Sequence, residues 1–175
     1  STDKDHKEDH LDISFTAVPA SLVTSYRDVL KDAGFMPLAF ETEPHALVRA
    51  LIKPEDKRAQ MILDFGKTRT SFLIAIGHRV GFTSTTKTAG ESLDRALSKA
   101  HSMTLAEGGK LKKEKGISPP LMPVVSEIKD EAKKHIAYWE SHSDEHNNPH
   151  KNIEKIILCG GDANLIGFPE YLSRE

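Results

Sequence analysis

The sequence has little cysteine, no strong charge of either sign and no long apolar run, and each shortage excludes something. Its single cysteine, Cys159, cannot form an internal disulfide, which is typical of a reducing compartment. Lys and Arg number 24 against 26 Asp and Glu, so the formal net charge is −2. Because nucleic-acid-binding domains usually carry a basic excess, we expect no nucleic-acid partner.

Signals for membranes and secretion are missing as well. No apolar run approaches the roughly 20 residues that span a bilayer, and the polar residues 1–6 lack a signal-peptide core. We therefore expect a cytoplasmic protein with no direct membrane insertion, held at a membrane only by another protein.

The common catalytic motifs are absent too. The chain has no P-loop, no Gly-x-Ser-x-Gly elbow, no His-Glu-x-x-His helix and no cysteine pair. Catalysis by a side-chain nucleophile is therefore unsupported, and no catalytic residue is predicted.

What is present is enough apolar material, 38% of 175 residues, for one domain or two small lobes. Apolar periodicity and turn residues predict alternating strands and helices. The expected strands cover residues 11–17, 35–40, 60–64, 70–76, 82–87 and 156–159, and the expected helices cover 22–33, 41–51, 89–103, 122–139 and 169–172. Residues 1–10 are expected to be flexible, and residues 108–119, rich in Gly and Lys, to form a solvated linker.

One candidate site follows the strand at 60–64. Asp64 ends the strand, Gly66 allows a tight turn, and Lys67, Thr68 and Thr70 add a cation and two hydroxyls. These groups suit a phosphate with Mg²⁺, which Asp64 would hold through water. Taken alone, an ordinary β-hairpin turn explains the same residues better.

A second candidate follows the strand at 156–159. Gly160 and Gly161 are adjacent glycines, which usually serve a positive φ or a close backbone approach, and Asn164 follows them. A tight strand-to-helix turn is an equally good explanation. Because ligands collect where strands end in open α/β sheets, the two turns together predict one nucleotide cleft.

Two weaker patterns remain. Glu107 and Lys110 lie one helical turn apart and suit ribose hydroxyls or a purine edge, although an exposed ion pair is the more economical explanation. Histidines recur at His142, His146 and His150, a spacing that a metal site on a helix would use. The Ser, Asn and Pro residues among them favour a polar loop instead.

The motifs, taken in order, resemble those of a known superfamily. Asp64-x-Gly66-x-x-x-Thr70, then Gly90-Glu91-Ser92-Leu93, then Ala106-Glu107-x-x-Lys110, then Gly160-Gly161-x-Ala163, are similar to the second half of the actin-like ATPases. The residues at 33–37 and 43–50 extend the resemblance to the PilM family of type IV pilus assembly, with the division protein FtsA more distant. The resemblance implies an α/β chain of the actin-like (ribonuclease H-like) fold, a mixed sheet flanked by helices.

The resemblance also implies a ligand and roles for the candidate residues. ATP and Mg²⁺ would be the cofactors, with Asp64 reaching the metal through water and Gly66 and Thr68 at the β- and γ-phosphates. The remaining nucleotide-binding positions would be Lys67, Thr70, Gly90, Glu107, Lys110, Gly160, Gly161 and Asn164. Glu107 and Lys110 would hold ribose or adenine, while Gly160, Gly161 and Asn164 would close over the nucleoside.

The partner implied by the resemblance is the N-terminal cytoplasmic segment of a PilN-like inner-membrane protein, with self-association possible. The chain would then be an ATP-binding scaffold, peripheral to the inner membrane, with slow hydrolysis at most. Alternatives are an FtsA-like division filament, a sugar or acetate-type kinase of the same fold, for which no convincing catalytic Asp is seen, and a lobe that has lost nucleotide binding.

Two departures from the family pattern bear on these expectations. No Asp-x-Gly turn for a first phosphate loop precedes residue 11, so we expect a fragment with an incomplete first lobe. The expected domains are a flexible segment at 1–10, a remnant of the first lobe at 11–53, and a nucleotide lobe at 54–175 with an inserted subdomain at about 90–122. Lys67 and Arg69 stand where small residues are usual, which would crowd the phosphate loop or add positive charge.

Overall fold

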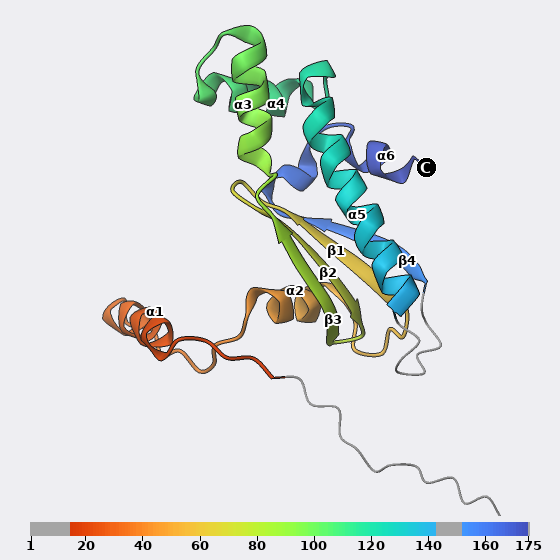
Figure 1. Cartoon of the computed structure of the whole chain (residues 1–175). Helices are drawn as coiled ribbons and strands as arrows, with labels where there is room; N and C mark the ends of the chain where they lie inside the picture. The colour runs from red at the N-terminus through yellow and green to blue at the C-terminus, as the bar shows by residue number, and fades with distance from the viewer. Residues whose placement is uncertain (1–14, 143–151, 175) are drawn as a thin grey trace, which may run out of the picture. The chain divides into compact units, whose positions relative to one another are not determined.

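A computed structural model describes residues 15–142 and 152–174 (Figure 1), and its contacts divide the chain into two compact units, Ser1–Glu41 and Thr42–Glu175. In the first unit, α1 (Ala20–Asp32) confirms the expected helix at 22–33. It ends where Gly34, at φ +83°, turns the chain so that the Phe35 N–H donates to the Leu30 carbonyl at 2.9 Å. No residue of α1 is buried, although its periodicity predicted a packed face.

The strands expected on either side of α1 do not form among the described residues. Residues 35–40 and 15–17 belong to no strand or helix, and residues 11–14 lie outside the described part of the chain. A strand requires a hydrogen-bonded neighbour, which periodicity alone does not supply. The prediction of a strand at 35–40 was therefore wrong.

The second unit is built on a four-stranded mixed sheet in the order β3-β2-β1-β4. The strands β1 (Ala59–Phe65), β2 (Thr70–Ile76) and β3 (Arg79–Thr86) form the expected antiparallel meander. The last strand, β4 (Ile153–Cys159), pairs with β1 in parallel, and the register shifts by one residue between Ala59 and Gln60, which are opposite Ile153 and Lys155. This bulge brings Cys159 opposite Asp64 at the far end of the pair.

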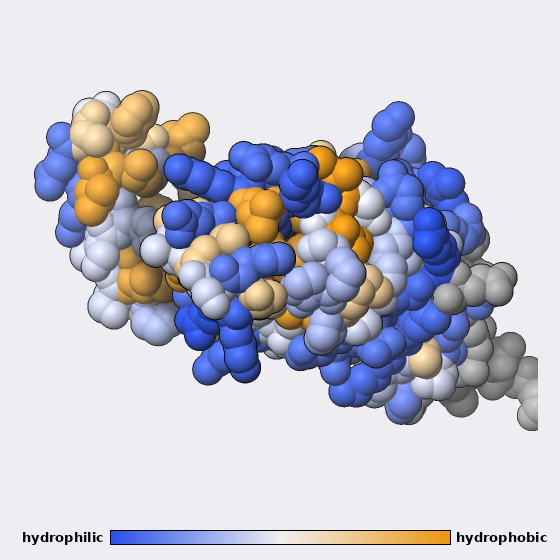
Figure 2. Space-filling model, turned by 90° about the horizontal axis from the view of Figure 1, so that it is seen from above, coloured by the Kyte–Doolittle hydropathy of each residue, from blue (hydrophilic) through white to orange (hydrophobic). Residues whose placement is uncertain are grey.

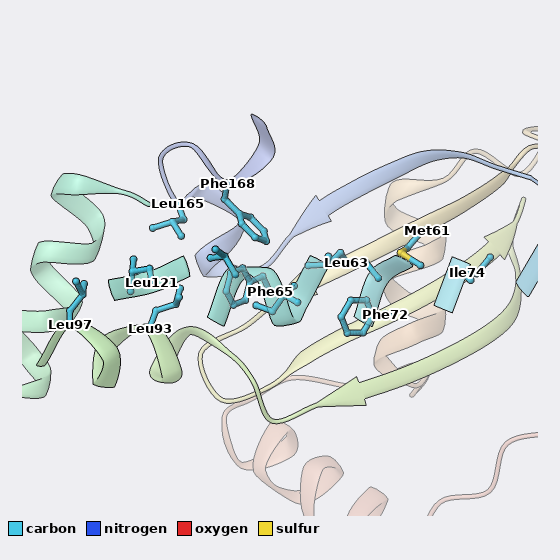
Figure 3. Packing of buried hydrophobic residues seen from close by; sticks show 13 residues of the cluster. Met61, Leu63, Phe65, Phe72, Ile74, Leu93, Leu97, Leu121, Leu165 and Phe168 are labelled. Atoms are coloured by element: carbon cyan, nitrogen blue, oxygen red, sulfur yellow. The ribbon is translucent and has the colours of Figure 1, made fainter. Parts of the chain in front are cut away.

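Helices cover both faces of the sheet, which is why β1 and β2 are almost continuously apolar. Successive strand residues point to opposite faces, so alternate residues of β1 enter different cores. On one face Met61, Leu63 and Phe65 pack under α5 (Met122–His142), with Phe168 of α6 (Phe168–Ser173) against Phe65 (Figure 3). On the other face Ile62 packs with Val48 and Ile52 at the end of α2 (Glu43–Leu51).

The segment expected to be a solvated linker is folded. Residues Leu105–Lys115 form α4, which packs on α3 (Gly90–His101), and a 3₁₀ turn, η1 (Pro119–Leu121), follows it. Thr104 and Glu107 form a reciprocal cap: the Glu107 N–H donates to the Thr104 hydroxyl at 3.3 Å, and the Thr104 N–H donates to the Glu107 carboxylate at 2.8 Å. The expectation of a linker at 108–119 was wrong because Gly and Lys composition outweighed this capping signal.

The surface of the second unit around α3 and α4 is largely hydrophilic, which is why the composition of residues 108–119 suggested a linker. Seen from above, hydrophilic side chains predominate, with small apolar areas between them (Figure 2). Lys110 and Lys113 are exposed in this region, whereas Lys112 between them is buried.

The long helix α5 carries a buried histidine. His135 is 9% exposed, and its ring lies 5.0 Å from that of Phe72 and 5.1 Å from that of Phe82. Burial lowers the pKa of His135 below 6.5, although Glu131, 3.5 Å away, acts in the opposite direction. The fold therefore holds the neutral imidazole.

We predict that the stability of the chain falls on acidification because His135 resists protonation only when folded. Its folded pKa is lower than its unfolded one, so the stabilisation is present above pH 6.5 and is lost as the pH falls below it. Thermal melts from about pH 7.5 to about pH 5 should show a smaller decline for His135→Leu than for the unaltered chain. His101→Leu, at an exposed position, is the control; equal declines for all three proteins would contradict the prediction.

Candidate functional site

The ends of β1 and β4 form the centre of the candidate site. Asp64 is opposite Cys159 in the parallel register, and Gly160 follows directly. Gly160 has φ +88°, and a Cβ placed on it would lie 2.4 Å from Oδ1 of Asp64 and 2.5 Å from the Phe65 carbonyl oxygen. Only glycine fits this approach, so the structure brings the two predicted turns into contact.

Asp64 is the main ionisable group where β1 and β4 end. It points to the same side of the sheet as α2, whose first residue, Glu43, interacts with it and forms an ion pair with Arg69. Burial raises the pKa of Asp64, the nearby Glu43 raises it further, and Arg69 acts in the opposite direction. Burial and the adjacent Asp64 also raise the pKa of Cys159 to about 11, so the thiol stays protonated at neutral pH.

Two acidic side chains that lie next to each other favour a cation between or beside them. Asp64 and Glu43 therefore fit the expected Mg²⁺ held through water. Among the residues that the structure describes, no group of three or more His, Cys, Asp or Glu side chains could itself enclose a metal ion. Sequence reasoning missed Glu43, for which the signal was an acidic residue before Pro44 at a predicted helix start.

The hairpin between β1 and β2 is attached to the start of α3. The Gly66 N–H donates to the Arg69 carbonyl at 3.1 Å, and the Gly66 carbonyl accepts from the Gly90 N–H at 2.9 Å. The Lys67 carbonyl accepts from the Glu91 N–H at 2.8 Å. These bonds bring Gly66, Lys67 and Gly90 together, and the Gly66 N–H is used within the turn.

The hydroxyls of the hairpin differ in their surroundings. Thr70 is fully buried, and its hydroxyl donates to the Thr88 carbonyl at 2.7 Å, so this hydroxyl holds the hairpin to the next loop. Thr68 and Lys67 are exposed at the tip. Of the predicted phosphate-binding side chains, these two are the ones presented to solvent.

A buried lysine joins α4 to the turn after β4. Lys112 is 5% exposed, and its Nζ lies 2.7 Å from Oδ1 of Asp94 on α3 and 2.6 Å from Oδ1 of Asp162. The same ammonium donates to the Gly90 carbonyl at 3.2 Å. Asp162 belongs to a 3₁₀ turn, η3 (Gly161–Asn164), so Lys112 joins two helices to the predicted nucleoside turn.

The side chains of the other predicted residues form no ion pair with this cluster in the described part of the chain. Glu107 is exposed, and its carboxylate caps α4 through Thr104, whose hydrogen bonds lower the Glu107 pKa. Lys110 is exposed, as are Gly161 and Asn164. The lysine that reaches the turn is thus Lys112, which sequence reasoning had assigned to a linker.

The histidine pattern is only partly described. His142 is the last residue of α5 and stacks on Tyr138 with ring centroids 4.2 Å apart. His146 and His150 lie outside the described residues. The predicted helix ended at 139 and a polar loop was favoured for the histidines, so the prediction was wrong at His142, which is still helical.

Comparison of the sequence with models of known families identifies the family of this chain. The family model described as "Type IV pilus assembly protein PilM" matches residues 2–175. The chain belongs to the PilM family. The predicted membership is thereby confirmed.

Solved structures agree with this fold. A PilM–PilN type IV pilus biogenesis complex matches with a TM-score of 0.70 at 22% identity, over 86% of this chain and 44% of that one. The ethanolamine utilization protein EutJ of Carboxydothermus hydrogenoformans matches with a TM-score of 0.65 at 23% identity, over 85% and 51%. MreB 5 of Spiroplasma citri, bound to AMPPNP, matches with a TM-score of 0.66 at 18% identity, over 89% and 57%.

The predicted actin-like α/β fold is therefore confirmed, and the chain spans about half the length of the structures that it matches. A search of curated proteins found no match. Within the described residues, no helix is both long enough and apolar enough to cross a membrane.

Two adjacent glycines should differ in how much stability they lose on the same substitution. We predict that Gly160→Ala lowers the free energy of unfolding by roughly 1–3 kcal/mol, because its φ of +88° and its contact with Asp64 leave no room for a methyl group. Gly161→Ala is the matched control, since nothing lies within 4 Å of its Cβ position. Urea unfolding measures both, and equal losses would count against the close approach.

Proposed function

We propose that this member of the PilM family binds ATP with Mg²⁺ at the ends of β1 and β4, and that the bound nucleotide controls recruitment of a partner. The observation that carries the proposal is the contact of Gly160 with Asp64, which places two glycine turns at one edge of the sheet. A structural relative, MreB5 of Spiroplasma citri, is described as bound to AMPPNP in one structure and to ADP in another.

In this proposal different residues of the chain bind the metal, the phosphates and the nucleoside. Asp64, with Glu43 beside it, takes Mg²⁺ through water, and the metal neutralises phosphate charge when bound. The exposed Lys67 and Thr68 face the phosphates, while buried Thr70, Gly66 and Gly90 hold the hairpin that presents them. Gly160, Gly161 and Asn164 close over the nucleoside, with Glu107 and Lys110 at its rim.

The partner in this proposal is the N-terminal cytoplasmic segment of a PilN-like inner-membrane protein, because one matching structure is a PilM–PilN complex. ATP then acts chiefly as a conformational ligand whose different affinity for two arrangements shifts the recruitment state. Hydrolysis is slow, self-association accompanies assembly, and the protein is cytoplasmic and peripheral to the inner membrane. The family match favours this function over the FtsA-like filament and the kinase.

The proposed binding of ATP with Mg²⁺ is tested with the variant Asp64→Asn. Without the Asp64 charge the metal loses its anchor, so we expect Mg·ATP to bind the full-length protein at least about tenfold more weakly, or about 1.4 kcal/mol. Isothermal titration with and without EDTA measures this, and the difference between variant and unaltered protein should largely vanish in EDTA. Asp130→Asn, an exposed carboxylate on α5, is the control. No heat from the unaltered protein would show a lobe without nucleotide binding.

The recruitment half is tested by titrating the partner's N-terminal peptide into full-length protein with Mg·ATP, with Mg·ADP and with neither. A coupled system should change peptide affinity by about 5-fold or more between nucleotide states, as is usual for linked sites. The same affinity in all three titrations would reject nucleotide control but keep the partner. No heat in any of them would reject the partner.

A further inference from the structure

We propose that Lys112 is a positioning residue that holds the η3 turn against Gly90, and that nucleotide binding depends on this placement. The inference rests on the proposed function, because the turn is the segment expected to close over the nucleoside. Lys112 acts through Asp162 and the Gly90 carbonyl rather than on the ligand itself.

The burial of Lys112 shows how strongly this contact is specified. Its ammonium contacts the carboxylate of Asp94 on α3, the carboxylate of Asp162 on η3 and the carbonyl of Gly90 at the start of α3. A buried ammonium is tolerated only when paired, and removing it leaves Asp94 and Asp162 facing each other without a counter-charge. The turn therefore keeps its place only while the lysine is present.

Two glycines make this arrangement possible. A Cβ on Gly90 would lie 1.7 Å from Oδ2 of Asp162, so Asp162 occupies the space that any side chain at position 90 would need. A Cβ on Gly108 would lie 2.6 Å from the Asp94 carbonyl oxygen, so α4 approaches the backbone of α3 closely enough for Lys112 to reach the ion cluster. The glycine that composition assigned to a linker is thus used for helix packing.

Gly90 extends the effect to the phosphate side. Its N–H donates to the Gly66 carbonyl while its own carbonyl accepts from Lys112. One residue therefore joins the β1–β2 hairpin and the η3 turn, the two segments that must approach the same nucleotide. Displacing Asp162 would therefore weaken the attachment of both the hairpin and the η3 turn to Gly90.

The first experiment compares Lys112→Met with Lys112→Arg and with Lys113→Met, the exposed neighbour, in the full-length protein. Isothermal titration gives the affinity for Mg·ATP, and hydrogen exchange reports the Ala163 and Leu165 N–H groups, which donate to the Gly160 and Asp162 carbonyls. We expect Lys112→Met to bind at least about tenfold more weakly and to exchange these amides faster. Lys112→Arg should recover part of both effects, and Lys113→Met should match the unaltered protein.

The second experiment is a double-mutant cycle on the Gly90–Asp162 contact. Gly90→Ala should weaken ATP binding because Asp162 blocks the new methyl group, and Asp162→Ala should relieve that clash, so the double variant should lose less than the sum of the two. If Lys112→Met fails to fold, Asp162→Asn, which removes one charge only, carries the same expectations.

The outcomes separate this inference from the proposed function. Unaltered ATP affinity and amide protection in Lys112→Met, with only a lower melting temperature, would overturn the inference and leave the proposed function standing. Additive losses in the cycle would also overturn it. If the unaltered protein binds no ATP, the proposed function fails and the nucleotide part of the inference with it, whereas faster exchange in Lys112→Met would still support the positioning of the turn.

Discussion

The parallel pairing of β1 with β4 is the interaction on which the rest of this structure depends. The two strands are separated by residues 66–152, so their pairing closes a long loop at an entropic cost that the apolar side chains of both strands must offset. The pairing completes the sheet, provides the faces on which α2 and α5 pack, and places the turns after Asp64 and Cys159 side by side.

The alternation of side chains along β1 then separates structural from candidate functional residues. Met61, Leu63 and Phe65 enter the core under α5, whereas Asp64 points toward α2 and meets Glu43. A charged residue near the end of a mostly apolar strand is costly to bury, and the raised pKa of Asp64 reflects that cost. The candidate site therefore lies on the face of the sheet where the strand pattern is interrupted.

The elements that could be predicted from the sequence are those whose signals are local. The meander, α3, α5 and the final strand each show clear periodicity and turn residues, and the order of the motifs identified the family. The strand at 35–40 was wrong because strand formation depends on a neighbour. The helix α4 was missed because its glycines look like a linker, although they permit close packing on α3. Lys112 and Glu43 escaped notice because their importance comes from residues distant in sequence, Asp162 and Asp64.

The one-residue bulge at the start of the β1–β4 pair has a consequence at the opposite end. Had the pairing of Ala59 with Ile153 continued without it, Leu158 rather than Cys159 would face Asp64, and every later side chain of β4 would turn to the other core. The surroundings of Asp64 and Glu43 thus depend on one extra residue in β4, at the opposite end of the strand pair. Inserting or deleting a single residue near Glu154 would therefore change which residue of β4 lies opposite Asp64 without any substitution at Asp64 or Glu43.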